Sequence, residues 1–186
     1  MAIELLHSGN PNEPSAPWSQ ESWVTWTAQM LDSYHKWTGR HLIHRVPSNE
    51  LPSDTADTLR AVQLTESQKL FEAPFVVVSH GTEADPLLNY GNQTALELWE
   101  MSLSQLIGTP SRRTAEPVHR EERAMLLQRT RDFGFIDDYS GIRISATGRR
   151  FRIHQATVWN IVDSTGNHVG QAAAFSSWTF LQPDQS

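Results

Sequence analysis

Hydrophobic spacing near the start of the chain predicts an amphipathic helix. Large apolar residues recur there every three or four positions, which places them on one helix face. These residues are Trp23, Trp26, Met30, Tyr34 and Trp37. Ser19 is a suitable N-cap, and Thr38-Gly39 is a suitable helix end. An aromatic face of this kind is covered by the chain's own core or by a partner, and we take it as a candidate homodimer or partner interface.

A second helix is expected after a linker that contains two prolines, Pro47–Ser53. Ser53 or Asp54 would cap this helix, which runs to about Phe71. Beyond Pro74 the pattern changes to short apolar runs that are typical of strands, and residues 80–86 have the composition of a turn. The predicted elements are strands at 75–78 and 87–90, short helices at 92–99 and 103–107, a longer helix at 118–133, and strands at 135–145, 150–162 and 169–178.

This order predicts an α+β fold: a five-stranded antiparallel sheet with helices on one face, preceded by the N-terminal amphipathic helices. Within the strand at 150–162, four apolar residues are expected to share a face, with polar interruptions between them. They are Phe151, Ile153, Trp159 and Ile161. The expected division is a flexible tail at 1–16, a helical segment at 17–72, a sheet-containing core at 73–181 and a short tail at 182–186.

Composition excludes several chemistries. None of the 186 residues is cysteine, so disulfides, thiolate zinc sites, iron–sulfur clusters, cysteine nucleophiles and cysteinyl–flavin adducts are ruled out. No apolar run approaches the ~20 residues that span a bilayer, and the N-terminus lacks the basic and apolar regions of a signal peptide. We therefore expect a cytoplasmic protein without a membrane partner.

Charge is unevenly distributed along the chain. The formal net charge is −6, yet residues 107–152 hold ten basic and six acidic groups, and all ten basic groups are arginines. A basic block inside an acidic protein argues against a nucleic-acid partner. Arginine without lysine fits carboxylate pairing or an anionic ligand, although ordinary surface ion pairs would give the same composition.

Several sequence blocks resemble the MEKHLA domain family. Two of them are Asn89-Tyr-Gly-Asn-Gln-Thr-Ala-Leu-Glu-Leu-Trp99 and Gly134-Phe-Ile-Asp-Asp-Tyr-Ser-Gly-Ile-Arg143. Others lie at 31–40, 73–80, 110–116, 149–153, 156–160 and 170–173, so the resemblance covers roughly residues 20–180. It implies a PAS-like fold, which agrees with the predicted element order.

The family occurs as stand-alone proteins in bacteria and algae, the type that this chain resembles. It also occurs at the C-terminus of plant class III homeodomain–leucine zipper transcription factors, where it is regarded as a sensory or dimerisation-modulating module. This sequence contains no basic region, zipper or lipid-binding domain, so the transcriptional role is not expected to transfer.

A PAS-like sheet commonly holds a small molecule between its inner face and the short helices. Seven aromatic or polar residues are candidates for such a site, because small-molecule pockets combine aromatic walls with a few polar groups. They are Tyr90, Asn92, Trp99, Tyr139, Arg143, Trp159 and Gln171. In the alternative, Trp99 and Trp159 fill the core and Asn92 caps the following helix. Arg143 and Gln171 are harder to explain as core residues: they could hold a ligand carboxylate or pair with Glu116 or Asp138.

Cofactors and metals have no strong signature. The sequence does not exclude a flavin or a haem, and His119 is the one candidate for an axial haem ligand. Neither the turn with His80, Glu83 and Asp85 nor the pair His41 and His44 has a recognised metal spacing, so no metal site is expected.

The leading hypothesis is a non-enzymatic PAS-like sensory module that binds an unidentified small organic ligand and acts through a homodimer or partner. One alternative is a small enzyme that uses His80, Asp138 and Arg143, since these could act as acid–base or charged groups. The other is a ligand-free interaction module whose core is filled by Trp99 and Trp159.

Overall fold

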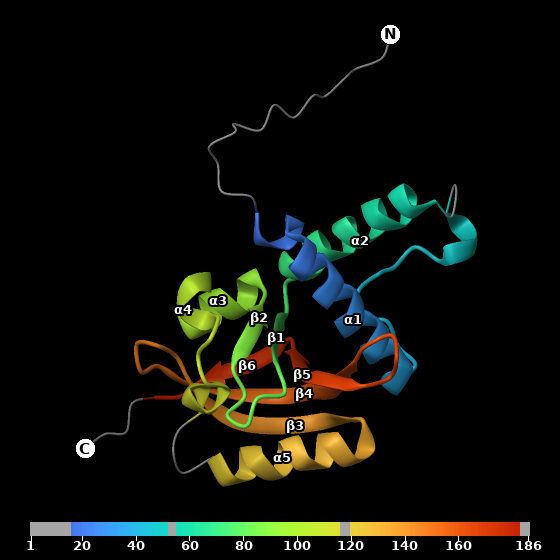
Figure 1. The fold of residues 1–186 in the computed structure, drawn as a ribbon. Helices are drawn as coiled ribbons and strands as arrows, with labels where there is room; N and C mark the ends of the chain where they lie inside the picture. The colour runs from blue at the N-terminus through green and yellow to red at the C-terminus, as the bar shows by residue number, and fades with distance from the viewer. Residues whose placement is uncertain (1–15, 52–54, 116–119, 183–186) are drawn as a thin grey trace.

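The computed structural model describes residues 16–51, 55–115 and 120–182 (Figure 1). The predicted flexible tail lies outside these ranges except for Ala16, and so do residues 183–186 of the predicted C-terminal tail. The proposed helix caps Ser53 and Asp54 lie outside them as well.

Two helices open the described chain. A 3-10 turn, Pro17–Ser19, leads into α1 (Glu21–Thr38). The N-cap of α1 is Gln20, and not Ser19 as the sequence predicted. Gly39 ends α1 in the left-handed conformation, with φ of 69°, which a residue without a side chain adopts at little cost. After a second 3-10 turn, Ser48–Glu50, helix α2 (Ala56–Phe71) begins at Thr55, whose hydroxyl accepts a hydrogen bond from the Thr58 amide.

The sheet is antiparallel throughout. Its strands are β1 (Val76–His80), β2 (Leu88–Gly91), β3 (Phe135–Ile144), β4 (Arg150–Val162), β5 (His168–Phe175) and β6 (Ser177–Phe180), in the spatial order β2-β1-β5-β4-β3. The run predicted as one strand at 169–178 is two strands, because the chain bends at Ser176. The second of them, β6, pairs with the first part of β4. His80, expected in a turn, is the last residue of β1 and pairs with Gln171.

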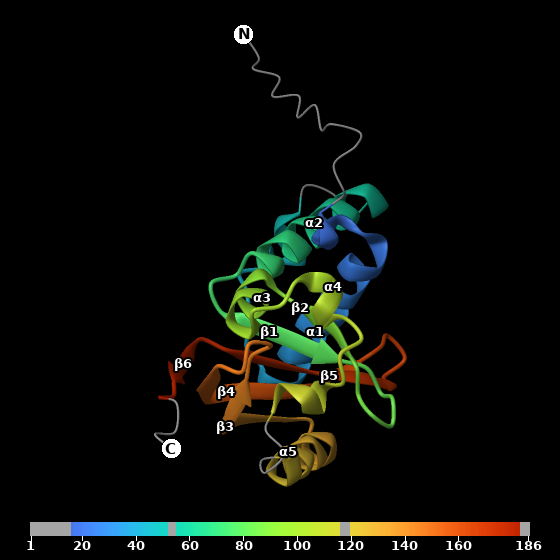
Figure 2. The ribbon, with the colours of Figure 1, turned by 90° about the vertical axis from the view of Figure 1, so that its left-hand side faces the viewer.

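Helices cover both faces of this sheet. Helix α1 packs on one face, which we call the α1 face. The other, the cavity face, carries α3 (Gln93–Trp99), and beside it lie α4 (Leu103–Leu106) and a 3-10 turn, Ser111–Thr114. Helix α5 (Arg120–Phe133) runs along β3, on the side of the sheet away from α1 (Figures 1 and 2). The predicted PAS-like helices therefore lie on one face, and the N-terminal helices add a layer on the other.

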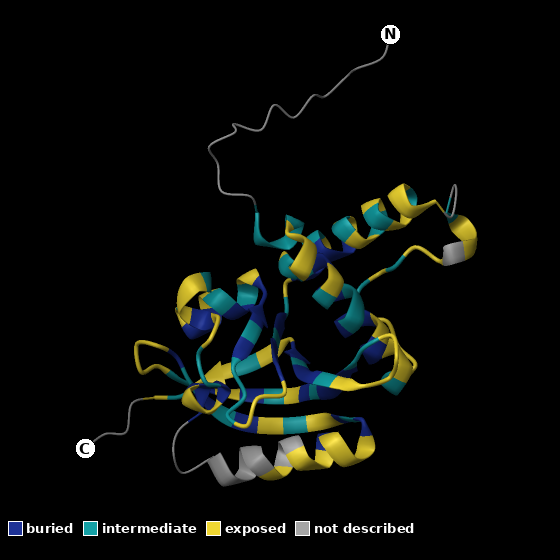
Figure 3. Cartoon of the chain, viewed as in Figure 1, coloured by how far each residue is buried: buried dark blue, intermediate teal, exposed yellow. Residues whose placement is uncertain are grey.

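Two groups of buried side chains hold these layers together. Figure 3 marks the buried positions along the strands and helices in dark blue. On the α1 face, Met30 and Tyr34 pack with Val77, Trp159 and Ile161. On the cavity face, the buried group is Val76, Ala95, Leu98, Trp99, Phe151, Ile153, Ala156 and Phe175. The sheet is therefore apolar on both sides, as a sheet between two helical layers must be.

The prediction that Phe151, Ile153, Trp159 and Ile161 share one face of β4 is wrong. The first two belong to the cavity face and the last two to the α1 face. The reason is a bulge at Gln155, whose φ of 49° is unusual for a residue other than glycine. One extra residue in a strand reverses the face of every following side chain.

Candidate ligand-binding site

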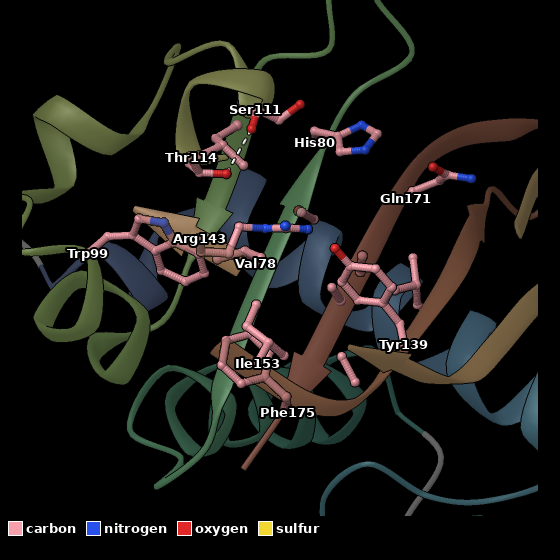
Figure 4. A pocket seen from close by; sticks show the side chains of 16 residues that line it. Val78, His80, Trp99, Ser111, Thr114, Tyr139, Arg143, Ile153, Gln171 and Phe175 are labelled. Carbon is pink, nitrogen blue, oxygen red and sulfur yellow. Dashed lines mark hydrogen bonds between the residues drawn. The ribbon is translucent and has the colours of Figure 1, made fainter. Parts of the chain in front are cut away.

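A small cavity of about 70 Å³ lies on the cavity face, between the sheet and the segment that contains α3 and the 3-10 turn Ser111–Thr114 (Figure 4). Side chains from β1, β3, β4 and β5 form its walls. Much of the lining is aliphatic or aromatic, from Val78, Leu88, Ile153, Ala156, Val158, Ala173 and Phe175. The polar or amphipathic part comes from His80, Trp99, Ser111, Thr114, Tyr139, Arg143 and Gln171.

Arg143 is the principal charged group of the cavity. It projects from β3 and is 7% exposed. Its Nη1 donates a hydrogen bond of 2.9 Å to the main-chain oxygen of the preceding residue, Ile142. Its guanidinium carbon lies 5.2 Å from the centre of the Tyr139 ring, a cation–π contact. Figure 4 shows the side chain extending across the cavity.

Gly141 permits this arrangement of Tyr139 and Arg143. A Cβ atom at residue 141 would overlap the Tyr139 hydroxyl and would stand 3.3 Å from Nη1 of Arg143. Both polar tips therefore lie over the same glycine, at an irregularity in the pairing of β3 with β4. A residue without a side chain lets the two groups approach the backbone closely.

Trp99 contributes a buried polar atom. It ends α3, is 3% exposed and packs edge-on against Phe151 and Phe175. Its indole N–H has no hydrogen-bond partner among the described residues. Most buried polar groups of folded proteins are hydrogen-bonded, so an unsatisfied donor in a residue that lines the cavity is unusual.

Gln171 connects the cavity with two helices through Asn160, which is buried in β4. The Gln171 side-chain amide donates to Oδ1 of Asn160 over 2.9 Å. Asn160 in turn donates from Nδ2 to the main-chain oxygen of Thr130 in α5, and its own main-chain oxygen accepts the indole N–H of Trp37 in α1. Asn160 was not among the residues predicted from the sequence, although a polar residue between Trp159 and Ile161 was a usable signal.

Three of the seven candidate residues do not line the cavity. Tyr90 and Trp159 lie on the α1 face, and burial raises the pKa of the Tyr90 hydroxyl. Asn92 is fully buried and holds backbone groups: its Oδ1 accepts from the amides of Val77 and Ala95, and its Nδ2 donates to Phe75. The cavity contains the other four, Trp99, Tyr139, Arg143 and Gln171.

The candidate interface residues on α1 face the sheet of their own chain. Met30 and Tyr34 are buried, and Trp23, Trp26 and Trp37 are partly buried against the same group. The indole N–H of Trp26 donates to the Ser79 hydroxyl over 2.9 Å. Trp23 and Trp26 also line a shallow open groove with Ser22, Asn89 and Tyr90.

Of the residues considered for catalysis, His80 and Arg143 line the cavity, whereas Asp138 is exposed and does not line it. Glu116 and the haem candidate His119 lie outside the described residues. Within the described part of the chain, no three His, Asp or Glu side chains come together in a way that could hold a metal ion.

Flavin does not fit this cavity. A cavity of ~150 Å³ is filled by a single benzene ring. The volume of about 70 Å³ between these side chains is too small for the three fused rings of a flavin. It is also too small for a haem, which is larger than a flavin ring system.

The chain is similar to one known domain family and to two curated plant proteins. The family model of the MEKHLA domain matches residues 24–180. Two curated proteins of Arabidopsis thaliana, the homeobox-leucine zipper proteins ATHB-9 and ATHB-14, are 28% and 26% identical over 100 residues. That alignment covers 54% of this chain but 12% of each relative.

Solved structures with the same fold include PAS and light-oxygen-voltage domains. A PAS domain of a protein from Colwellia psychrerythraea aligns with a TM-score of 0.52 and 14% identity, over 63% of this chain and 94% of that one. An RNA-binding light-oxygen-voltage receptor aligns with a TM-score of 0.54 and 11% identity, over 72% of this chain and 36% of that one. Identities this low show the fold alone. No helix in the described ranges is long and apolar enough to cross a membrane.

Proposed function

The chain belongs to the MEKHLA domain family and has a PAS-like fold, and we propose that it is a sensory module that binds a small organic ligand in the cavity of Figure 4. The observation that carries this proposal is the cavity itself. It combines an apolar wall with the buried Arg143 guanidinium and the unsatisfied Trp99 indole N–H. An apolar pocket with a few convergent polar groups is the usual form of a small-molecule site.

Hydrogen bonds supply a route by which occupancy of the cavity would reach α1. Gln171 lines the cavity and contacts Asn160, which accepts from Trp37 of α1. Ser79, in β1 at the cavity, accepts from Trp26 of the same helix. A ligand that moves β1 or β5 would therefore also move α1, because these hydrogen bonds connect the helix to the strands.

The output of the module, in this proposal, is a contact between α1 and a second copy of the chain or another protein. Although Met30 and Tyr34 are buried, Trp23 and Trp26 keep part of their rings exposed at the groove beside Asn89. Partly exposed tryptophans are frequent in protein interfaces, since they bury a large apolar area on contact.

Native mass spectrometry and an absorption spectrum test the ligand part of the proposal. Protein purified without added compounds should carry a non-covalent adduct that is lost on denaturation. A mass of the bare chain, together with no thermal stabilisation by a panel of small metabolites, would contradict ligand binding. That result would favour an interaction module with a filled core.

Light scattering over a range of protein concentrations tests the contact. A homodimer should give a mass that rises with concentration, and Trp23→Ala should weaken the association. A monomer mass that does not depend on concentration would contradict the homodimer.

A further inference from the structure

Arg143 is a buried cation without a counter-ion among the described residues. At 7% exposure it has lost most of its contact with water, yet the hydrogen bond that the structure gives it goes to the main-chain oxygen of its neighbour Ile142. No described carboxylate lies within ion-pair distance of it. Removing an arginine from water without a counter-charge is costly, and folded proteins compensate buried charges by pairing.

Arg45 provides a comparison within the same chain. Its side chain is 23% exposed, so it is less buried than Arg143. It nevertheless pairs with two carboxylates, at 2.8 Å to Glu66 and 2.6 Å to Asp32. Among the described residues, counter-ions therefore accompany the half-buried arginine outside the cavity but not the more buried one inside it.

The neighbouring polar groups of the cavity are also donors. The indole N–H of Trp99 can only donate, and so can the guanidinium N–H groups of Arg143. The Tyr139 hydroxyl, which lies beside Arg143 over Gly141, can donate as well. A wall with several donors and a positive charge is complementary to an anion with planar, paired oxygen acceptors, because the guanidinium fork matches that geometry.

Size and polarity define the anion further. A cavity of about 70 Å³ has room for the equivalent of about five water molecules, which suits an acid of two to four carbons. One arginine balances one negative charge, and a phosphate dianion would leave excess charge against an aliphatic wall. Val158, Ala173 and Phe175 would contact the alkyl part of a short acid.

We propose that the cavity binds a small monocarboxylate through Arg143, with the indole N–H of Trp99 as a second donor. The proposal rests on the proposed function, since it names the chemical class of the ligand of the same site. It assigns Arg143 as the residue that distinguishes an acid from a neutral compound of the same shape.

The direct test is a titration of isotope-labelled protein followed by NMR at the tryptophan indole resonances. The probes are acetate, propionate and butyrate, with propionamide as the neutral isostere and inorganic phosphate as the dianion. The Trp99 resonance, which the Trp99→Phe variant identifies, should shift when at least one of the carboxylates is added. This shift should saturate at a carboxylate concentration below tens of millimolar. Propionamide and phosphate should cause no saturable shift.

Arg143→Met and Arg152→Met form a matched pair of variants. Arg152 lies in β4 with its side chain exposed, so its loss removes the same charge away from the cavity. We expect Arg143→Met to weaken carboxylate binding by about a hundredfold or more, since it removes a charge-assisted contact, and Arg152→Met to leave it unchanged. We also expect Arg143→Met to unfold at the same temperature as the unliganded wild type or higher, because it removes an uncompensated buried charge.

The outcomes separate this proposal from the proposed function. The monocarboxylate assignment is overturned by the absence of a saturable shift with all three acids, by equal binding of propionamide, or by unchanged binding to Arg143→Met. Destabilisation of unliganded Arg143→Met would also overturn it, because the arginine would then serve the fold. A neutral compound found by native mass spectrometry would remove the assignment and leave the proposed function standing.

Discussion

The indole nitrogen of Trp159 donates a hydrogen bond of 3.1 Å to the main-chain oxygen of Met30. The two residues are 129 positions apart, one in β4 and the other in the middle of α1. The Trp159 ring also packs edge-on against Tyr34, with 5.0 Å between the ring centroids. This contact joins the N-terminal helix to the centre of the sheet, on the face opposite the cavity.

Truncation of Trp159 should reduce stability without removing ligand binding. Trp159→Ala is expected to lower the free energy of unfolding by about 3–5 kcal/mol, because it empties a fully buried site. Trp159→Phe keeps a ring and should cost less, although it leaves the indole contact to Met30 unmade. Urea denaturation measures both changes. Loss of ligand binding in a variant of wild-type stability would contradict the placement of Trp159 on the α1 face.

Asn92 should prove to be a structural residue. Its side chain bonds the amides of Val77 and Ala95, which are buried, and the main-chain oxygen of Phe75. Asn92→Ala should lower the free energy of unfolding by about 2–4 kcal/mol, since buried backbone groups lose their partners and α3 loses its cap. Its exposed neighbour is the control, and Gln93→Ala should change stability by less than about 0.5 kcal/mol. Equal effects of the two substitutions in chemical denaturation would refute this role.

The carboxylate of Glu100 should make stability depend on pH. Hydrogen bonds from the hydroxyls of Ser145 and Thr147 hold the pKa of this carboxyl below its ordinary value of 4.5. A lowered folded pKa means that the folded state resists protonation, so the stabilisation is complete above that ordinary value. It is lost as the pH falls through the lowered one.

Glu100→Gln measures this contribution. Because it removes the titrating group, the variant should lose less stability than the wild type between neutral and strongly acidic pH. Denaturant unfolding at a series of pH values provides the comparison. Parallel pH profiles for the two proteins would show that the hydrogen bonds at Glu100 do not influence stability.

A side chain at residue 170 should disturb the packing of α1. A Cβ on Gly170 would overlap the main-chain oxygen of His80 and stand 3.2 Å from the Trp26 ring. Gly170→Ala should lower the free energy of unfolding by about 1–3 kcal/mol, as overpacking does in a filled core. It should also change the fluorescence of the protein, since Trp26 must move. Wild-type stability and emission would mean that α1 is held less closely to β5.

Much of the secondary structure could be predicted from local pattern. The three late strand segments were found, and β4 has its predicted bounds, because alternation and turn residues act over a few positions. His80 was misplaced in a turn, since its strand position depends on pairing with Gln171. The division of the run at 169–178 into β5 and β6 depends on long-range pairing in the same way.

The candidate site was harder to predict, since it depends on which face each side chain occupies. Tyr139, Gly141 and Arg143 alternate along β3 and so share a face, but only the pairing of β3 within the sheet decides that this face borders the cavity. Tyr90 and Trp159 have the composition of pocket aromatics but lie on the α1 face. No local signal distinguishes these two cases, because both faces of this sheet are buried and apolar.

The sequence by itself determined the order of the elements, the antiparallel character of the sheet and the MEKHLA family, since periodicity, turn residues and family motifs are all written in contiguous residues. Only the tertiary structure decided the faces of β4, the burial of the α1 tryptophans against their own sheet, and the presence of Arg143 in a cavity without a described counter-ion. These features depend on a bulge at Gln155 and on contacts between residues more than a hundred positions apart in the sequence. Each of them requires the whole fold to form first.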